Sequence, residues 1–225
     1  MTRYIKAEQG LHHSVIYTTD DGRYFRYSEG RWTWRNNNPG NLVPGHVSKR
    51  HNQIGVAGAF AVFPDYETGH SALIDCLRTT HWNESIDKML NGYAPKKYNP
   101  NLAKYKKFLH QQTGVIGNKK IRDFTSGEFE KLWKAIERWE GWAKGNVVEV
   151  GKISCVCKNK KNIICKYCAD TMGWISKDEC INLAKQGKID AEIYTSGLGN
   201  LYVRARTHST FQKDFDDLVE KKHES

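Results

Sequence analysis

The sequence predicts a mixed α+β protein with a mainly helical domain between an N-terminal β-hairpin and a small, cysteine-containing α+β domain. Residues 14–34 are rich in β-branched and aromatic side chains, residues 66–140 carry apolar side chains at helical spacing, and four cysteines fall within residues 155–168. These patterns predict a hairpin extension over 1–33, a helical domain over 34–148 and an accessory domain over 149–225.

Length and composition limit the class of protein. The chain has 225 residues, of which 39% are hydrophobic, enough for one medium domain and one small domain with packed cores. Its longest apolar stretch, Gly55 to Phe63, is too short to span a bilayer, and the first residues lack the apolar run of a secretory signal. We therefore expect no membrane span and synthesis in the cytoplasm, with another route carrying the protein to any outside target.

The charge balance indicates an anionic partner. The formal net charge is +10 and the isoelectric point is near 9.2. Nucleic acid, an acidic membrane face and an acidic cell-wall polymer all fit this charge. The lysines are spread along the chain, which is typical of a solvated surface, and no aromatic platform or fold motif for nucleic acid accompanies them.

The sequence has short strand patterns before and after the segment around residue 40. Val15 to Thr18 and Tyr24 to Tyr27 flank the turn residues Asp20-Asp21-Gly22, so we expect a β-hairpin there. Ala59 to Phe63 predicts a further short strand or extended segment that leads into a helix.

The loop between these patterns contains an unusual number of amides. Its sequence is Trp34-Arg35-Asn36-Asn37-Asn38-Pro39-Gly40-Asn41-Leu42. Ordinary turn chemistry accounts for Asn38-Pro39-Gly40. It leaves Arg35, Asn37 and Asn41 as extra hydrogen-bonding groups. Such groups suit a ligand rich in hydroxyls and amides, for example a sugar polymer.

Helical patterns follow this loop. The first runs from Tyr66 to about Thr80, with Asp65 as its N-cap and Glu67 in the positive first turn. Two further helices are expected at about Ser85 to Gly92 and Asn101 to Gln112, because prolines and a glycine bound them.

The last helix of this domain carries a carboxyl group on its apolar face. Thr125 and Glu128 form a capping box that begins the helix. Glu140 lies within the arc of the helical wheel that holds Phe129, Leu132, Trp133, Ile136 and Trp139. A carboxyl group there is costly unless it is paired or protonated. Either Glu140 ends the helix and is neutralised by an arginine, or it is a general acid.

Glycoside cleavage needs one carboxylic acid that an apolar setting keeps protonated near neutral pH. Glu140 meets this requirement. A second carboxylate is dispensable when the acetamido group of the substrate assists or the product is an anhydro sugar. Glu67 and Asp65 are candidates for the second role, although the preferences of a helix start account for both without catalysis.

The composition changes between about Gly145 and Gly151. Cys155, Cys157, Cys165 and Cys168 form a Cys-x-Cys and Cys-x-x-Cys pattern, which fits a structural four-thiolate zinc site. Disulfides formed after export fit it equally well. A helix over Ser176 to Gln186 and two strands within Ile189 to Arg206 complete the predicted module.

Four segments in order resemble a family of bacterial peptidoglycan-degrading domains, found in phage lysins and in toxins delivered by type VI secretion. They are Trp34 to Asn41 (WRNNNPGN), Gly58 to Gly69 (GAFAVFPDYETG), Tyr93-Ala94-Pro95 and Glu140-Gly141-Trp142. The resemblance covers about residues 30 to 146. It implies a small, mostly helical lysozyme-like domain that cuts the glycan strand.

The order of these segments is similar to a circular permutation of the site in flagellar-type glucosaminidases and soluble lytic transglycosylases. In those enzymes the helix that ends in the catalytic glutamate precedes an Asn-rich loop. The comparison implies that Glu140 is the acid and that the Asn-rich loop lines the cleft. The resulting site comprises Glu140 and Glu67 as catalytic groups, with Arg35, Asn37, Asn38, Asn41, Tyr66 and Trp142 binding sugar.

The sequence therefore predicts a lysozyme (muramidase) or lytic transglycosylase that acts on peptidoglycan as an exported antibacterial effector or lysin. We expect it to act in the periplasm or cell wall of a target cell and to need no cofactor for catalysis. An immunity or inhibitor protein and a secretion machinery are its other expected partners. The rival interpretation is a basic protein that binds cell wall or nucleic acid without catalysis.

Overall fold

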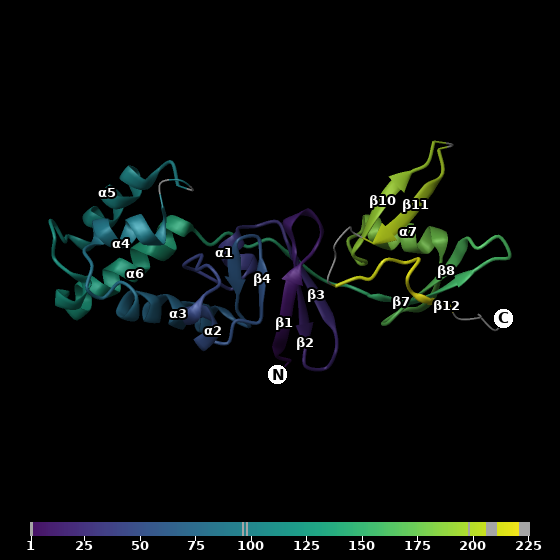
Figure 1. Cartoon of the computed structure of the whole chain (residues 1–225), viewed down its shortest axis with the longest axis horizontal. Coiled ribbons are helices and arrows are strands. Elements are labelled where there is room, and N and C mark those ends of the chain that lie inside the picture. Colours follow the sequence, from purple (N-terminus) through teal and green to yellow (C-terminus); the bar gives the residue numbers. More distant parts are fainter. Residues whose placement is uncertain (1, 96, 98, 198, 206–210, 221–225) are drawn as a thin grey trace. The chain divides into compact units, whose positions relative to one another are not determined.

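The computed structural model describes residues 2–95, 97, 99–197, 199–205 and 211–220. It has a mixed α+β fold (Figure 1), as the sequence predicts. Contacts divide the chain into two units. The helical unit contains Gly30–Ile54 and Ala59–Lys144, and the strand-rich unit contains the segments up to Glu29, Gly55–Gly58 and from Gly145. Within the described residues, none of the helices has the length and apolar character needed to cross a membrane.

The helical unit contains most of the predicted helices. Its elements are α1 (Trp32–Arg35), α2 (His46–Arg50), β5 (Phe60–Val62), α3 (Tyr66–Thr79), α4 (Ile86–Tyr93), α5 (Leu102–Thr113), the short 3-10 helix η2 (Ile121–Asp123) and α6 (Ser126–Glu140). In Figure 1, α4, α5 and α6 lie close together at the far end of this unit from α1. The predicted helices over 66–80, 85–92 and 101–112 match α3, α4 and α5 to within a residue or so.

Side-chain caps begin the helices α3 and α6. Asp65 Oδ1 accepts a hydrogen bond from the backbone N–H of Thr68 at 2.7 Å, which confirms it as the N-cap of α3. At α6, Thr125 Oγ1 accepts a hydrogen bond from the backbone N–H of Glu128 at 3.2 Å, and Glu128 Oε2 accepts one from the backbone N–H of Thr125 at 2.7 Å. These bonds satisfy N–H groups that a helix start leaves open, and they confirm the predicted capping box.

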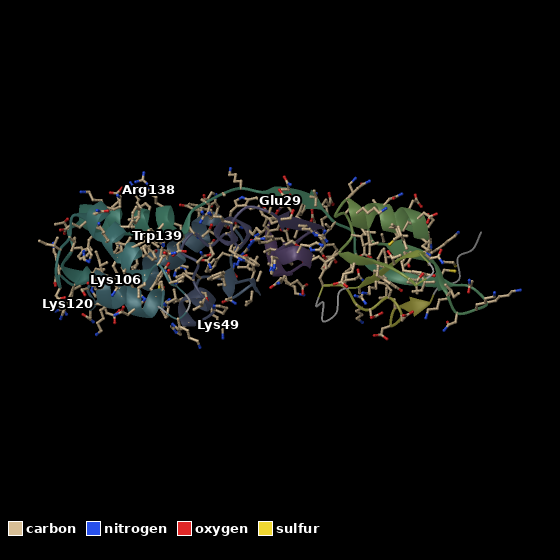
Figure 2. All side chains as sticks on the ribbon, turned by 90° about the horizontal axis from the view of Figure 1, so that it is seen from above. Glu29, Lys49, Lys106, Lys120, Arg138 and Trp139 are labelled. Atoms are coloured by element: carbon tan, nitrogen blue, oxygen red, sulfur yellow. The ribbon has the colours of Figure 1, made fainter. Side chains whose placement is uncertain are left out.

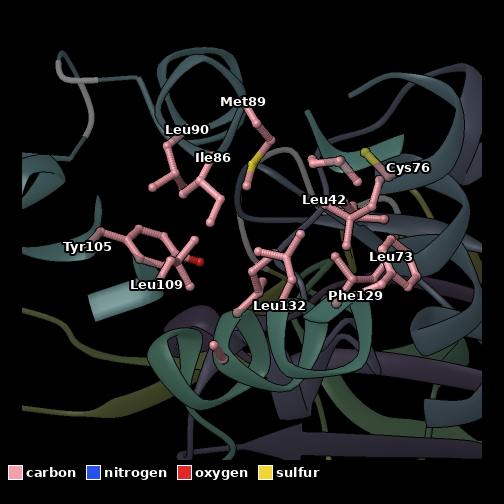
Figure 3. Close-up of a cluster of buried hydrophobic side chains, with 14 of the residues drawn as sticks. Leu42, Leu73, Cys76, Ile86, Met89, Leu90, Tyr105, Leu109, Phe129 and Leu132 are labelled. Atoms are coloured by element: carbon pink, nitrogen blue, oxygen red, sulfur yellow. The ribbon is translucent and has the colours of Figure 1, made fainter. Parts of the chain in front are cut away.

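One hydrophobic cluster holds the helices of this unit together. Figure 3 shows side chains from the helices converging on Leu132, with Leu73 and Phe129 to one side and Tyr105 and Leu109 to the other. The fully buried members include Leu73, Leu77, Met89, Leu90, Leu109, Leu132 and Ile136. Each such side chain contributes about 1.5–3 kcal/mol on burial. The cluster therefore fixes α6 against α3, α4 and α5.

The strand-rich unit begins with a mainly antiparallel sheet. Strands β2 (Val15–Thr19) and β3 (Tyr24–Ser28) form the predicted hairpin, with Val15 opposite Tyr27. Strands β1 (Tyr4–Gln9), β4 (Gly55–Ala57) and β6 (Asn146–Glu149) extend it in the order β4-β1-β2-β3-β6, in which β1 and β4 form a parallel pair. Strand β1 was not predicted, because its polar residues Lys6, Glu8 and Gln9 obscure the alternation typical of a strand.

The C-terminal part of this unit contains a second sheet and a helix. The sheet has the order β12-β7-β8-β9, with β7 (Ile153–Lys158), β8 (Ile164–Ala169), β9 (Gly173–Ser176) and β12 (Val219–Glu220). The predicted helix is α7 (Lys177–Lys185), which Ser176 and Glu179 cap. The two predicted strands are β10 (Ala191–Thr195) and β11 (Leu201–Ala205), an antiparallel pair beside α7 (Figure 1).

A buried ion pair joins the two ends of the strand-rich unit. Arg26 on β3 donates to the carboxylate of Asp190, beside β10, at 2.6 Å, and Asp190 also accepts the backbone N–H of Leu11 at 3.1 Å. Contacts therefore group the N-terminal hairpin with the cysteine-containing segment. The predicted domains, 1–33, 34–148 and 149–225, stay a prediction about which segments fold independently.

Two glycines allow a test of how closely α3 packs on the Asn-rich loop. A Cβ at Gly69 would lie 1.9 Å from the backbone oxygen of Asn37, whereas a Cβ at Gly127 on α6 would meet no atom within 4 Å. We expect Gly69→Ala to lower the free energy of unfolding by about 3 kcal/mol through overpacking. Gly127→Ala should raise it by about 0.5–1 kcal/mol, because alanine favours the helix. Urea unfolding measures both, and equal stabilities would contradict the packing described.

Candidate active site

Glu140, the last residue of α6, lies on a cavity of about 740 Å³. Residues from four parts of the helical unit line this cavity, which we call the Glu140 cavity. They include Arg35 and Asn41 around the Asn-rich loop, Phe60 on β5, Tyr93 at the end of α4, and Trp139 and Glu140 on α6. The combination of aromatic walls and a few polar groups is typical of a site for a small or extended ligand.

Two neutral donors hold the carboxyl group of Glu140. Asn41 Nδ2 donates to Oε2 at 2.9 Å, and the Tyr105 hydroxyl donates to Oε1 at 3.1 Å. Asn41 adopts a left-handed backbone conformation, with φ of 48°, which asparagine tolerates better than most residues. The Asn-rich loop and α6 therefore meet at the site, although 99 positions separate these two residues in the sequence.

The Tyr105 side chain is fixed by aromatic packing. Its ring is fully buried and stacks on Trp139, with ring centroids 4.6 Å apart and planes 10° from parallel. Figure 2 shows Trp139 closer to the interior of the helical unit than its neighbour Arg138, which extends outward from α6. The stack sets the direction of the Tyr105 hydroxyl toward Glu140.

The pKa of Glu140 is raised above the ordinary glutamate value of 4.5, chiefly because burial disfavours the charged form. The hydrogen bonds from Asn41 and Tyr105 and the positive charge of Arg31 act in the opposite direction and do not outweigh burial. A larger fraction of Glu140 is therefore protonated near neutral pH than of an exposed glutamate. This is the property that a general acid requires.

An arginine satisfies the end of α6 but does not bind the Glu140 carboxyl group. Arg31 Nη1 donates to the backbone oxygen of Glu140 at 3.1 Å, and Thr33 Oγ1 donates to that of Gly141 at 2.5 Å. Gly141 has a φ of 77°, and a Cβ there would lie 3.0 Å from the Arg31 guanidinium carbon. The sequence left open that an arginine neutralises Glu140; the arginine contact is to its backbone instead.

The structure brings Arg35 and Asn41 to the Glu140 cavity but not all of the predicted sugar-binding amides. Arg35 lies over the ring of Trp32 at 4.0 Å. Asn38 is 0% exposed, and its side-chain amide bonds the backbone oxygens of Leu42 and Ala61 and the backbone N–H of Leu42, all at 2.9 Å. It therefore cannot touch a ligand, and its predicted role is corrected to a structural one.

The side chain of Asn37 also forms hydrogen bonds with the backbone. Its Nδ2 donates to the carbonyl oxygens of Phe63 and Pro64 at 3.3 and 3.2 Å, and its side chain is not among the residues that line the Glu140 cavity. These bonds join the Asn-rich loop to the segment after β5. The described contacts of Asn37 shape the loop, and its predicted contact with sugar stays a prediction.

Three other predicted residues gather in a different hollow of about 450 Å³. Tyr66, Glu67 and Trp142 line it, and it shares no described lining residue with the Glu140 cavity. The Tyr66 hydroxyl donates to the carboxylate of Glu137, and its ring meets that of Trp142 edge-on at 5.0 Å. Glu67 is exposed in the first turn of α3, so the structure does not place it as a second catalytic group beside Glu140.

Tyr105, Arg31 and Tyr93 belong to the site, although the sequence patterns did not indicate a role there for any of them. Tyr105 fits the core face of α5, and this interpretation is correct for its ring. A buried tyrosine nevertheless needs a partner for its hydroxyl group, and that requirement is the one available signal. Arg31 precedes the first recognised segment without a pattern of its own, and Tyr93 belongs to the recognised segment Tyr93-Ala94-Pro95, for which the resemblance implied no site role.

None of the six cysteines forms a disulfide in this structure. Cys155 and Cys157 lie on β7, and Cys165 and Cys168 lie on β8. Among the residues that the structure describes, no group of three or more His, Cys, Asp or Glu side chains is placed to hold a metal ion. A zinc site at these four cysteines stays a prediction.

The raised pKa of Glu140 predicts a pH-dependent cost to stability. Because the folded state binds this proton more tightly than the unfolded state, the stabilisation is complete below pH 4.5 and is lost as pH rises through the folded-state pKa. Glu140→Gln mimics the neutral form, so it should unfold at a higher temperature than the wild type at pH 7. The difference should shrink toward pH 4. Thermal unfolding at several pH values checks this, and a variant less stable at pH 7 than at pH 4, relative to wild type, would contradict it.

Comparisons of the chain with protein-family models, with curated proteins and with solved structures found no match. The chemistry of the Glu140 cavity is therefore the main basis for assigning a function.

Proposed function

We propose that this protein cleaves the glycan strand of peptidoglycan and that Glu140 is the acid that protonates the glycosidic oxygen. The observation that carries the proposal is a half-buried carboxyl group of raised pKa on a cavity lined by aromatic and amide side chains. The resemblance of residues 30 to 146 to peptidoglycan-degrading domains supports the same substrate. The net charge of +10 favours an anionic wall.

The walls of the Glu140 cavity suit a chain of N-acetylated sugars. Trp32, Phe60 and Tyr93 offer apolar faces and edges to pyranose rings. Arg35 and Asn41 supply polar groups to hydroxyls and acetamido groups. A volume of about 740 Å³ lies within the range of pockets that enclose a ligand of a few rings.

Glu140 transfers its proton to the leaving oxygen as the bond between that oxygen and the anomeric carbon breaks. The carboxylate that remains keeps the hydrogen bonds from Asn41 and Tyr105, which stabilise it. It then accepts the proton of the attacking hydroxyl group, either of water or of the sugar itself, and returns to its starting form. By donating hydrogen bonds, Asn41 and Tyr105 fix the position of the carboxyl group and favour its charged form.

A mechanism with one carboxyl group fits the site. Glu140 is the sole carboxylic acid among the described residues that line its cavity. The positive charge that develops on the sugar ring is then stabilised by the substrate's own acetamido group or captured by its own hydroxyl group. We therefore favour acetamido assistance or formation of an anhydro sugar over a pair of enzyme carboxylates.

The proposal extends to a role as an exported antibacterial effector or lysin that acts at the cell wall, with an inhibitor protein as a partner. A resemblance to domains of phage lysins and type VI toxins supports this role, and the Glu140 cavity is the surface that an inhibitor would block.

Digestion of purified peptidoglycan tests the activity. We expect Glu140→Gln to lower the rate by about 100-fold or more, the usual contribution of a general acid. The matched control is Glu130→Gln on the same helix, because Glu130 is exposed and pairs with Lys134 on the surface. It should retain wild-type activity.

Mass spectrometry of the products separates the possible reactions. Muropeptides are expected, and a product lighter by one water identifies an anhydro sugar. Full activity of Glu140→Gln would refute the assigned acid. Release of peptides alone would indicate an amidase or peptidase, and wall binding without products would indicate a non-catalytic protein.

A further inference from the structure

The hairpin of β7 and β8 brings four cysteines onto neighbouring strands of the strand-rich unit. Cys155 on β7 lies directly opposite Cys168 on β8. Farther along, Cys157 lies opposite Lys166, and the next paired residues are Lys158 and Ile164. Cys165 is therefore the extra residue of a β-bulge between these two pairs.

The bulge turns Cys165 toward Cys157. In a β-bulge two residues of one strand oppose a single residue of the other, so Cys165 and Lys166 both oppose Cys157. The contacts agree with this placement. Cys165 Sγ donates a hydrogen bond to the backbone oxygen of Cys157 at 3.1 Å.

These placements satisfy the backbone requirement for two cross-strand links. Opposed residues of antiparallel strands have Cα atoms about 4.5–5.5 Å apart, and disulfides join Cα atoms about 4.4–6.8 Å apart. We propose that this hairpin is a site of oxidative modification that forms two disulfides, Cys155 with Cys168 and Cys157 with Cys165, by exchange with an external disulfide. This proposal does not depend on the activity of the Glu140 cavity.

The exchange begins at the exposed thiol. Cys165 is exposed, and as its thiolate it attacks one sulfur of the external disulfide, which releases one thiol and leaves a mixed disulfide. Cys157 then attacks the sulfur of Cys165 and releases the second thiol. Two protein thiols are thus oxidised and one external disulfide is reduced to two thiols. Cys168, which is half-buried, begins the same sequence with Cys155.

The pKa of Cys165 is raised by burial and by its contacts with Cys157. Because the thiolate is the attacking species, the first step should become faster as pH rises. This dependence distinguishes exchange at Cys165 from oxidation that does not pass through a thiolate.

We expect the two remaining cysteines to stay reduced. Cys76 belongs to the core of the helical unit and Cys180 to that of the C-terminal module. Burial raises the pKa of the Cys76 thiol to about 11 and that of Cys180 to about 12. Both groups are therefore hidden and almost fully protonated near neutral pH.

The test oxidises the full-length, reduced protein with glutathione disulfide and counts thiols after denaturation. We expect the count to fall from six to two, with Cys76 and Cys180 unmodified. Trypsin then separates the cysteines, because Cys155 and Cys157 lie in the peptide 153–158, Cys165 in 162–166 and Cys168 in 167–177. In the wild type all three peptides should be linked.

Single substitutions reveal which cysteines pair. Cys157→Ser should link peptide 153–158 to 167–177 and leave Cys165 as a thiol or a glutathione adduct. Cys155→Ser should link 153–158 to 162–166 and leave Cys168 unpaired. Cys76→Ser is the control, since it should form both links. Circular dichroism confirms that each variant is folded.

Several results would overturn the proposal. Four or more thiols remaining in oxidised wild type would refute the formation of two disulfides, and reversed links in the two variants would refute the pairing. Zinc bound at one equivalent, with the four hairpin thiols protected from oxidation, would show that they form a metal site instead.

Discussion

The candidate site depends on the hydrogen bonds of the buried Asn38 amide. Its three hydrogen bonds join the Asn-rich loop to Leu42 and to Ala61 on β5, so they close the loop on itself and attach it to the strand. Asn37 adds bonds to the segment after β5. With the loop held in this way, Asn41 can adopt its left-handed conformation and place its amide on Glu140. The side chains of Asn37 and Asn38 in the Asn-rich loop thus mainly hold the loop in place, so that Asn41 can contact Glu140.

The second requirement is a helix that ends at the right place. Residues of the hydrophobic cluster fix the axis of α6, and the capping box at Thr125 fixes its start. Arg31 and Thr33 then bind the carbonyl groups of Glu140 and Gly141. Arg31 and Thr33 therefore donate to backbone oxygens, whereas the carboxyl group of Glu140 accepts hydrogen bonds from Asn41 and Tyr105, which are neutral. Since neither neutral donor offsets burial, the acid keeps a raised pKa.

Local patterns predicted much of this arrangement. The caps at Asp65 and Thr125, the hairpin at β2 and β3, and the position of Glu140 on an apolar stripe follow from short-range rules. Distant contacts did not follow from them. A helical wheel shows that Tyr105 is buried but not where its hydroxyl group points. Likewise, the sequence of an Asn-rich loop does not show which side-chain amides form hydrogen bonds with the backbone. Nor do local patterns show that Glu67 lines a different hollow from Glu140, because packing alone sets the positions of α3 and α6.

Titration of the Glu140 carboxyl group tests the central claim most directly. Glutamate labelled with ¹³C at the carboxyl carbon can be followed by NMR across the acidic range, with Glu140→Gln identifying the signal. We expect a pKa above 4.5 in the wild type. In Asn41→Ala, which lacks a donor to the charged form, the pKa should be higher still. A wild-type value at or below 4.5 would show that Glu140 is an ordinary paired carboxylate and would contradict its role as the acid.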